Sequence, residues 1–175
     1  TGTCRCCKRS SRCRGLVVRW RRTNWGYRMT DEQAQVEAFH RAFEIGVASR
    51  PCVPDERTRL LRERLIEEEF AELRDALSQG HVTQIAKELA DLLYVVYGTA
   101  VSCGIDVEPV FREVHRSNMS KVGGHKRADG KWMKPATYSP ARVEPILREQ
   151  GWTGAEPVGQ AGPCAPHTET GVTSP

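Results

Sequence analysis

The sequence predicts an all-α fold, a helical bundle of four to five helices with a central antiparallel pair. Three observations predict it. Between residues 29 and 149, apolar side chains recur every three to four positions, which is the period of a helix with one buried face. Glycine and proline residues interrupt this pattern at a few points, as turns between helices require. No segment alternates apolar and polar residues convincingly enough to indicate a β-strand.

The first helix is expected to begin near Thr30, because Thr30 and Gln33 have the spacing of a capping box. Its apolar positions follow at helical spacing: Val36, Phe39, Phe43 and Val47. The sequence Arg50-Pro51-Cys52-Val53-Pro54 then breaks the chain.

A long second helix is expected over residues 56–77 and a third over residues 83–103, joined by the turn Ser78-Gln79-Gly80-His81. The apolar side of the second helix is Leu61, Leu65, Leu73 and Leu77. A short fourth helix is expected over residues 108–118, followed by a loop. Ser139-Pro140 has the residue types of a cap and first-turn pair, and it is expected to open a final short helix.

Charge and cysteine content divide the chain into three regions. The net charge is +4, but residues 1–28 contribute nine Arg or Lys, no acid and four of the seven cysteines. We expect this leader to lie outside the fold, as upstream reading-frame sequence with translation beginning at Met29; the alternative is a nucleic-acid-binding arm. Residues 29–149 are expected to form the domain. Residues 150–175, rich in Gly, Pro, Thr and Ala, are expected to be a disordered tail.

The setting expected for the protein is soluble, reducing and cytoplasmic. The leader's only apolar run is Leu16-Val17-Val18, which is too short for a secretory signal. The longest apolar stretch, residues 92–105, is too short to span a bilayer. The cysteines also lack the paired spacing of a disulfide framework.

Four acids stand at matched positions on the two long helices. Glu69 and Glu72 are three residues apart, as are Glu88 and Asp91, so each pair shares one helix face. Glu72 and Glu88 are equally far from Gly80, and so are Glu69 and Asp91. In an antiparallel pair all four therefore lie within roughly one helical turn along the axis.

Hard oxygen donors of this kind suit Mg²⁺ or Mn²⁺. A di-iron bundle would require Glu-x-x-His motifs, which are absent from both helices. A solvated acidic surface is the alternative interpretation. Against it, Asp91 stands within the apolar run from Leu89 to Val96, where an acid is costly unless it is paired or metal-bound.

These motifs resemble the all-α NTP pyrophosphohydrolases, a group that includes MazG-like proteins, dimeric dUTPases and phosphoribosyl-ATP pyrophosphohydrolase. The resemblance runs from Val36 to Pro140 and is closest to the MazG-like, dUTPase-related branch. It rests on Glu68-Glu69-x-x-Glu72 and Glu88-x-x-Asp91. Three longer segments support the branch: Phe39 to Phe43, Glu88 to Tyr94, and Val114 to Lys121 followed by Arg127 to Lys131 and Lys134-Pro135.

The resemblance implies hydrolysis of a nucleoside or deoxynucleoside triphosphate between its α and β phosphates, for cleansing of the nucleotide pool. It implies that Glu69, Glu72, Glu88 and Asp91 bind Mg²⁺ and that Glu68 orients or deprotonates the attacking water. Glu68 is otherwise an ordinary surface or supporting acid.

The segment from Arg112 to Lys134 is basic and contains Gly123-Gly124, which is typical of a mobile phosphate clamp; a solvated loop is the alternative. The candidate substrate-binding residues there are Asn118, Lys121, Arg127, Lys131 and Lys134. His40 and Tyr94 are candidates for a base pocket, with plain core packing as the alternative.

The branch resemblance favours dUTP or another pyrimidine deoxynucleotide over phosphoribosyl-ATP as the substrate. A homodimer or homotetramer is expected, because the core of a single chain this size is modest. The rival interpretations are a non-catalytic helical interaction module and a nucleic-acid binder that uses the leader. The second is disfavoured, because the 17 basic residues after position 28 face 22 acidic ones.

Overall fold

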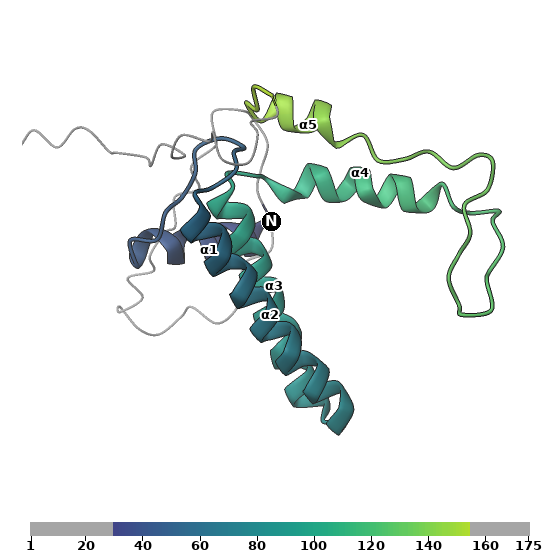
Figure 1. Ribbon diagram of the computed structural model, residues 1–175, viewed down its shortest axis with the longest axis horizontal. Helices are drawn as coiled ribbons and strands as arrows, with labels where there is room; N and C mark the ends of the chain where they lie inside the picture. The colour runs from purple at the N-terminus through teal and green to yellow at the C-terminus, as the bar shows by residue number, and fades with distance from the viewer. Residues whose placement is uncertain (1–29, 155–175) are drawn as a thin grey trace, which may run out of the picture.

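A computed structural model of the chain describes residues 30–154, and these residues form helices joined by turns and loops (Figure 1). The helices are α1 (Asp31–Ala42), α2 (Glu56–Gln79), α3 (Val82–Ser102), α4 (Val107–Met119) and α5 (Val143–Glu149). Within this part of the chain the only β pairing is an isolated bridge between Lys126 and Trp132. The all-α prediction is confirmed. The predicted leader and most of the predicted tail lie outside the described residues.

Helices α2 and α3 form the predicted antiparallel pair, which runs side by side away from the rest of the molecule (Figure 1). Asp55 caps α2 by accepting a hydrogen bond from the Thr58 amide at 2.8 Å. Gly80 ends the helix in the left-handed conformation, with φ of 74°, and donates its amide to the Ala76 carbonyl. Glycine adopts this conformation without a steric penalty. The turn predicted at Gly80 is therefore confirmed.

Helix α1 packs against α3. As predicted, the Thr30 hydroxyl caps it by accepting a hydrogen bond from the Gln33 amide at 3.2 Å. The buried Gln33 side chain does not complete the capping box. It donates to the Ile105 carbonyl at 2.7 Å and accepts from the Val107 amide at 3.1 Å. Gln33 thus fastens α1 to the junction between α3 and α4.

A second buried glutamine holds the same junction. Gln150, just after α5, accepts from the Asp106 amide at 3.0 Å and donates to the Asp106 carbonyl at 2.9 Å. There the chain bends by 114° from α3 into α4. Among residues 30–154 no single helix is long and apolar enough to cross a membrane; α3 and α4 meet that test only as this bent pair.

Helices α4 and α5 pack on each other and form an arm that points away from the α2–α3 pair (Figure 1). The prediction that Ser139-Pro140 opens the last helix is wrong, because α5 begins at Val143 with Arg142 as its N-cap. The Ser139 amide donates to the Ser120 hydroxyl at 2.9 Å, and the Pro140 carbonyl accepts from Arg116 at 3.0 Å. These bonds tie the segment to the end of α4.

The apolar core of the described chain is small. Its buried apolar residues are Val36, Leu73, Ala76, Ala100 and Val101. Part of the predicted apolar stripe is exposed instead, including Phe43, Leu61 and Leu77. Large apolar side chains on α2 and α3, such as Phe70 and Leu93, are also exposed. Much of the apolar surface that a closed bundle would bury therefore faces outward.

Candidate metal centre

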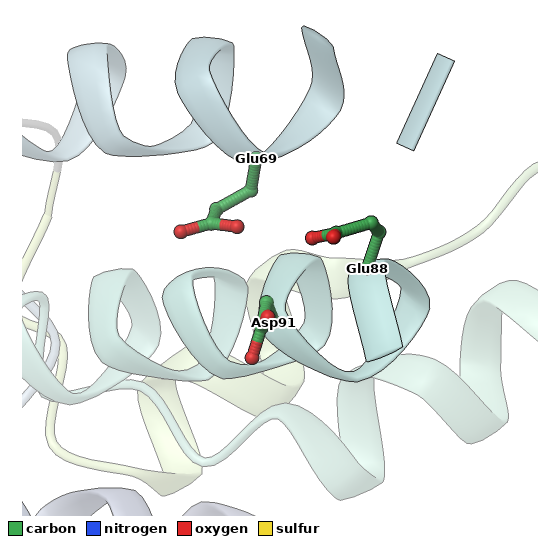
Figure 2. A group of neighbouring side chains, drawn as sticks. All are labelled: Glu69, Glu88 and Asp91. Atoms are coloured by element: carbon green, nitrogen blue, oxygen red, sulfur yellow. The ribbon is translucent and has the colours of Figure 1, made fainter. Parts of the chain in front are cut away.

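Three of the predicted metal ligands come together between α2 and α3. Glu69, Glu88 and Asp91 each offer a carboxylate oxygen, and these oxygens lie within 4.8 Å of one another. Figure 2 shows Glu69 reaching from α2 toward the helix that carries Glu88 and Asp91. The equal distances from Gly80 explain this meeting, because residues at equal distances from the turn lie at the same height in an antiparallel pair.

The fourth predicted ligand, Glu72, is exposed and is not part of this group. It lies close enough to affect Glu69 electrostatically. Burial raises the pKa of Glu69 above its ordinary value, and the charges of Glu72 and then Asp91 raise it further. A carboxyl whose pKa is raised by neighbouring carboxylates is one that gains from a nearby cation.

Lys87 supplies a cation that is not among the residues predicted for the site. Its ammonium group lies 2.8 Å from an oxygen of Asp91 and 3.1 Å from both oxygens of Glu88. Hydrogen bonds to Asp91 and then Glu88 raise the pKa of Lys87 well above its ordinary value. The four-residue spacing of Lys87 and Asp91 on one helix is a signal that could have revealed the pair.

Glu88 is the most enclosed of these acids, with 1% of its surface exposed. It accepts hydrogen bonds from Lys87 and from the Gln84 side chain. A buried carboxylate is stable only when its oxygens are paired or bound to a cation. The carboxylate oxygens of Glu69, Glu88 and Asp91 are therefore a suitable donor set for a hard divalent cation.

Glu68, the predicted base, is exposed on α2 beside Glu69. Its negative charge contributes to the raised pKa of Glu69. A base needs to reach a water molecule near the metal without being a ligand itself, and the position of Glu68 next to a ligand is compatible with that role.

The two predicted base-pocket residues lie near each other but differ in exposure. Tyr94 is 41% exposed and makes an edge-on ring contact with Phe39, with ring centroids 5.7 Å apart. His40, the neighbour of Phe39 on α1, is 2% exposed. Tyr94 stands one turn beyond Asp91 on α3 and can contact a ligand held at the acids, and His40 lies buried on α1.

The predicted phosphate-clamp residues lie at the end of α4 and in the loop that follows, on the arm that points away from the α2–α3 pair (Figure 1). Within one chain, the fold does not bring them to the acids. Lys121 donates to Asn118 at 2.8 Å, Arg127 pairs with Asp129, and Lys134 lies 4.3 Å from the centre of the Tyr138 ring. The loop closes on itself through the Lys131 carbonyl, which accepts from the Arg127 amide at 2.8 Å.

Comparison with known families identifies one match. Residues 36–118 match the family model described as phosphoribosyl-ATP pyrophosphohydrolase. The matched segment runs from α1 to the end of α4 and contains all five acids of the candidate site. None of the curated proteins matches the chain.

Proposed function

Because the chain belongs to the all-α NTP pyrophosphohydrolase superfamily, we propose that it hydrolyses a nucleoside or deoxynucleoside triphosphate between the α and β phosphates. The products are the monophosphate and pyrophosphate, and the role is cleansing of the nucleotide pool. The family match supports nucleotide pyrophosphohydrolase activity in general. The observation that carries the reaction is the meeting of Glu69, Glu88 and Asp91 between α2 and α3.

In this proposal Glu69, Glu72, Glu88 and Asp91 hold Mg²⁺, for which Mn²⁺ can substitute. The bound cation would offset the negative charge of the triphosphate and polarise a phosphoryl oxygen. Lys87 must leave Glu88 and Asp91 when the cation binds, because the same oxygens serve both. Glu68 then accepts a proton from the attacking water or orients that water toward phosphorus.

The clamp residues serve this reaction only if a second copy of the chain supplies them. Asn118 is in α4, and Lys121, Arg127, Lys131 and Lys134 are in the loop between α4 and α5. This arm points away from the α2–α3 pair, which carries the acids (Figure 1). The exposed apolar residues of α2, α3 and α4 give a second copy a surface to cover. A homodimer or homotetramer would close the bundle and deliver a basic loop to the phosphates.

For the substrate, the MazG-like and dUTPase-like motifs favour dUTP or another pyrimidine deoxynucleotide, with Tyr94 and His40 near the base. The second candidate is phosphoribosyl-ATP, because the matched family is named for that compound. A cytoplasmic setting accords with either nucleotide.

A screen of the common NTPs and dNTPs and of phosphoribosyl-ATP, with Mg²⁺ or Mn²⁺ and detection of pyrophosphate, tests the proposal. Pyrophosphate together with the matching monophosphate is the expected result. Absence of pyrophosphate from every nucleotide, with metal present and the oligomer intact, would support the non-catalytic interaction module instead.

A further inference from the structure

A buried polar cluster lies beside α1, away from the turn at Gly80, and of its members the proposed function uses His40 alone. We call it the Arg62 cluster: His40, Arg59, Arg62 and Ser102. Three of its members are almost fully enclosed, with exposures of 2% for His40, 5% for Ser102 and 7% for Arg62. One enclosed atom of each member lacks a hydrogen-bond partner: His40 Nδ1, Arg59 Nε, Arg62 Nε and Ser102 Oγ.

A glycine makes room for the cluster. A Cβ atom on Gly98, in the middle of α3, would lie 3.1 Å from a terminal nitrogen of Arg62 and 3.2 Å from Nε2 of His40. Arg59 and Arg62 are one turn apart on α2, as are Gly98 and Ser102 on α3, so each pair shares a helix face. His40 of α1 and Arg62 of α2 thus meet at a place on α3 where the backbone carries no side chain. Arg59 and Ser102 lie one turn away on the same faces of α2 and α3.

Arg62 has no acidic partner in the described chain. Burial lowers the pKa of its guanidinium, and Cys103 provides the only opposing charge effect. A guanidinium nevertheless stays protonated in proteins, so the positive charge remains. Leaving it buried and unpaired is costly, and a ligand that accepts hydrogen bonds would remove that cost.

The cluster also offers acceptors. Burial, and then the charge of Arg62, lower the pKa of His40, so its imidazole is neutral near pH 7. Nδ1 of His40 has no hydrogen-bond partner, and a neutral imidazole has one acceptor nitrogen, so Nδ1 can serve as an acceptor. The Ser102 hydroxyl can either donate or accept. A site in which a donor lies beside acceptors favours a neutral ligand that carries both an acceptor and a donor over a free anion.

The cluster lies in line with the acids. Arg62 precedes Glu69 by seven residues and Gly98 follows Asp91 by seven, so both lie toward the same end of the antiparallel pair. Seven residues correspond to about 10 Å along a helix. Tyr94 stands between Asp91 and Gly98, and its ring meets Phe39 of α1. The order is therefore the acids proposed to hold the metal, an aromatic side chain, and then buried hydrogen-bonding groups.

We propose that the Arg62 cluster forms hydrogen bonds with the edge of the nucleobase. It thereby selects bases with a lactam edge, in which a carbonyl adjoins a ring N–H. Arg62 donates to the carbonyl oxygen, and His40 Nδ1 or the Ser102 hydroxyl accepts from the N–H. Uracil, thymine, guanine and hypoxanthine carry this edge, whereas adenine and cytosine present an amino group and an unprotonated ring nitrogen. This inference rests on the proposed function, and it names the substrate class.

The test compares kcat/KM for dUTP, dTTP, dGTP and dITP with that for dCTP and dATP, in the wild type and in Arg62→Met. The wild type is expected to prefer the lactam bases by about 10- to 100-fold, as one well-placed two-point contact allows. Arg62→Met should remove most of that preference without lowering Tm, because it replaces an unpaired buried charge with an apolar chain. Arg64→Met is the matched control, since Arg64 is exposed on the same helix. It should retain the preference.

Gly98→Ala provides a second variant that should fold, because alanine favours a helix and the added methyl crowds the nitrogens of Arg62 and His40. It should weaken the preference for lactam bases. Calorimetric binding of dUMP against dCMP gives a readout that needs no turnover, and tighter dUMP binding that Arg62→Met abolishes is expected. Loss of all pyrophosphate release would refute the proposed function while this binding comparison still tests the cluster.

Three results would overturn the inference. One is a wild type that treats lactam and amino bases alike. Another is an Arg62→Met variant that keeps the preference, or that loses stability and activity on all bases equally. The last is stabilisation of the wild type, but not of Arg62→Met, by inorganic phosphate or chloride alone, which would identify an anion site.

Discussion

Lys87 shows how the acids of the candidate metal centre coexist in one chain. Its ammonium group bridges Glu88 and Asp91, which would otherwise repel each other along one face of α3. A protein cation in this place limits the repulsion before a metal binds, and it competes with the metal for the same oxygens. The metal affinity of the centre should therefore depend on a residue that is not itself a ligand.

Lys87→Met should raise the affinity for Mg²⁺ and Mn²⁺ by about tenfold, the low end of what one unit charge contributes at contact distance near a protein surface. It should also lower the stability of the metal-free protein, because the carboxylates lose their counter-charge. Calorimetric titration with Mn²⁺ and thermal unfolding with and without metal measure both effects. Unchanged metal affinity would mean that Lys87 does not compete for the site.

Glu68→Gln distinguishes a base from a ligand. If Glu68 activates the water, metal affinity should stay near the wild-type value while the single-turnover rate falls about 10²- to 10⁴-fold. Metal titration beside single-turnover kinetics provides the comparison. An equal loss of rate and of metal affinity would instead make Glu68 a ligand.

Single residues differ in how well the sequence reveals them. Glu69, Glu88 and Asp91 could be predicted, because their distances along the chain from the turn at Gly80 fix where two antiparallel helices bring them together. The Arg62 cluster could not. Arg62 stands in a helix rich in Arg and Glu, where a charged residue is ordinarily solvated, and its burial depends on His40 from another helix and on the missing side chain of Gly98.

At the scale of elements, local signals predicted the α2–α3 pair to within a few residues. Asp55 and Gly80 act on their own helix, so the sequence nearby is sufficient. The start of α5 depends on contacts between segments far apart in the chain, and there the local signal at Ser139-Pro140 was misleading. Likewise, the Gln33 side chain does not complete the capping box of α1, because it hydrogen-bonds to the junction between α3 and α4.

The link between α4 and the start of α5 rests on Glu113, which accepts from Arg116 at 2.8 Å and from the Arg142 amide at 2.7 Å. These bonds lower the pKa of Glu113 from 4.5 to about 2. Their stabilising contribution is therefore present above pH 4.5 and is lost as the pH falls toward 2. Glu113→Gln should weaken the attachment of α5 to α4 at neutral pH, as protonation of Glu113 does in the wild type at low pH.

Hydrogen exchange of residues 143–149 provides the measurement. Amide exchange should be faster in Glu113→Gln than in the wild type at pH 7. The difference between the two exchange rates should become smaller as the pH falls from 4.5 toward 2. Glu144→Gln is the matched control, since Glu144 pairs with Arg148 of its own helix in an exposed position. Equal exchange in the wild type and Glu113→Gln would show that other contacts, such as those of Gln150, hold α5 in place.

At the scale of the whole molecule, the described chain has a small core and an arm that points away from the α2–α3 pair (Figure 1). The sequence indicated a bundle but could not give the direction of α4, because an apolar stripe does not say which surface will cover it. The acids and the basic loop belong to one proposed site, yet one chain keeps them apart. Assembly of copies is the arrangement that reconciles these observations.

Mixing two inactive variants tests that arrangement. Asp91→Asn removes a ligand from the acids, and the double variant Lys121→Ala/Lys131→Ala removes two clamp residues from the arm. If one copy's arm serves the other copy's acids, each mixed dimer contains one intact site. An equimolar mixture that has exchanged subunits should then recover about one quarter of the wild-type activity in a twofold-symmetric dimer. A mixture as inactive as its components would place both sets of residues in the site of a single chain.

In the proposed reaction, the acids between α2 and α3 bind a divalent cation on which α–β cleavage depends. The most direct measurement follows the products formed from dUTP by the wild type and by Asp91→Asn, with and without Mg²⁺, while circular dichroism monitors helical content. We expect dUMP and pyrophosphate from the wild type only with Mg²⁺. We expect almost no product from Asp91→Asn, with its helices intact. Near-normal turnover by Asp91→Asn at saturating Mg²⁺, or release of dUDP and phosphate by the wild type, would contradict it.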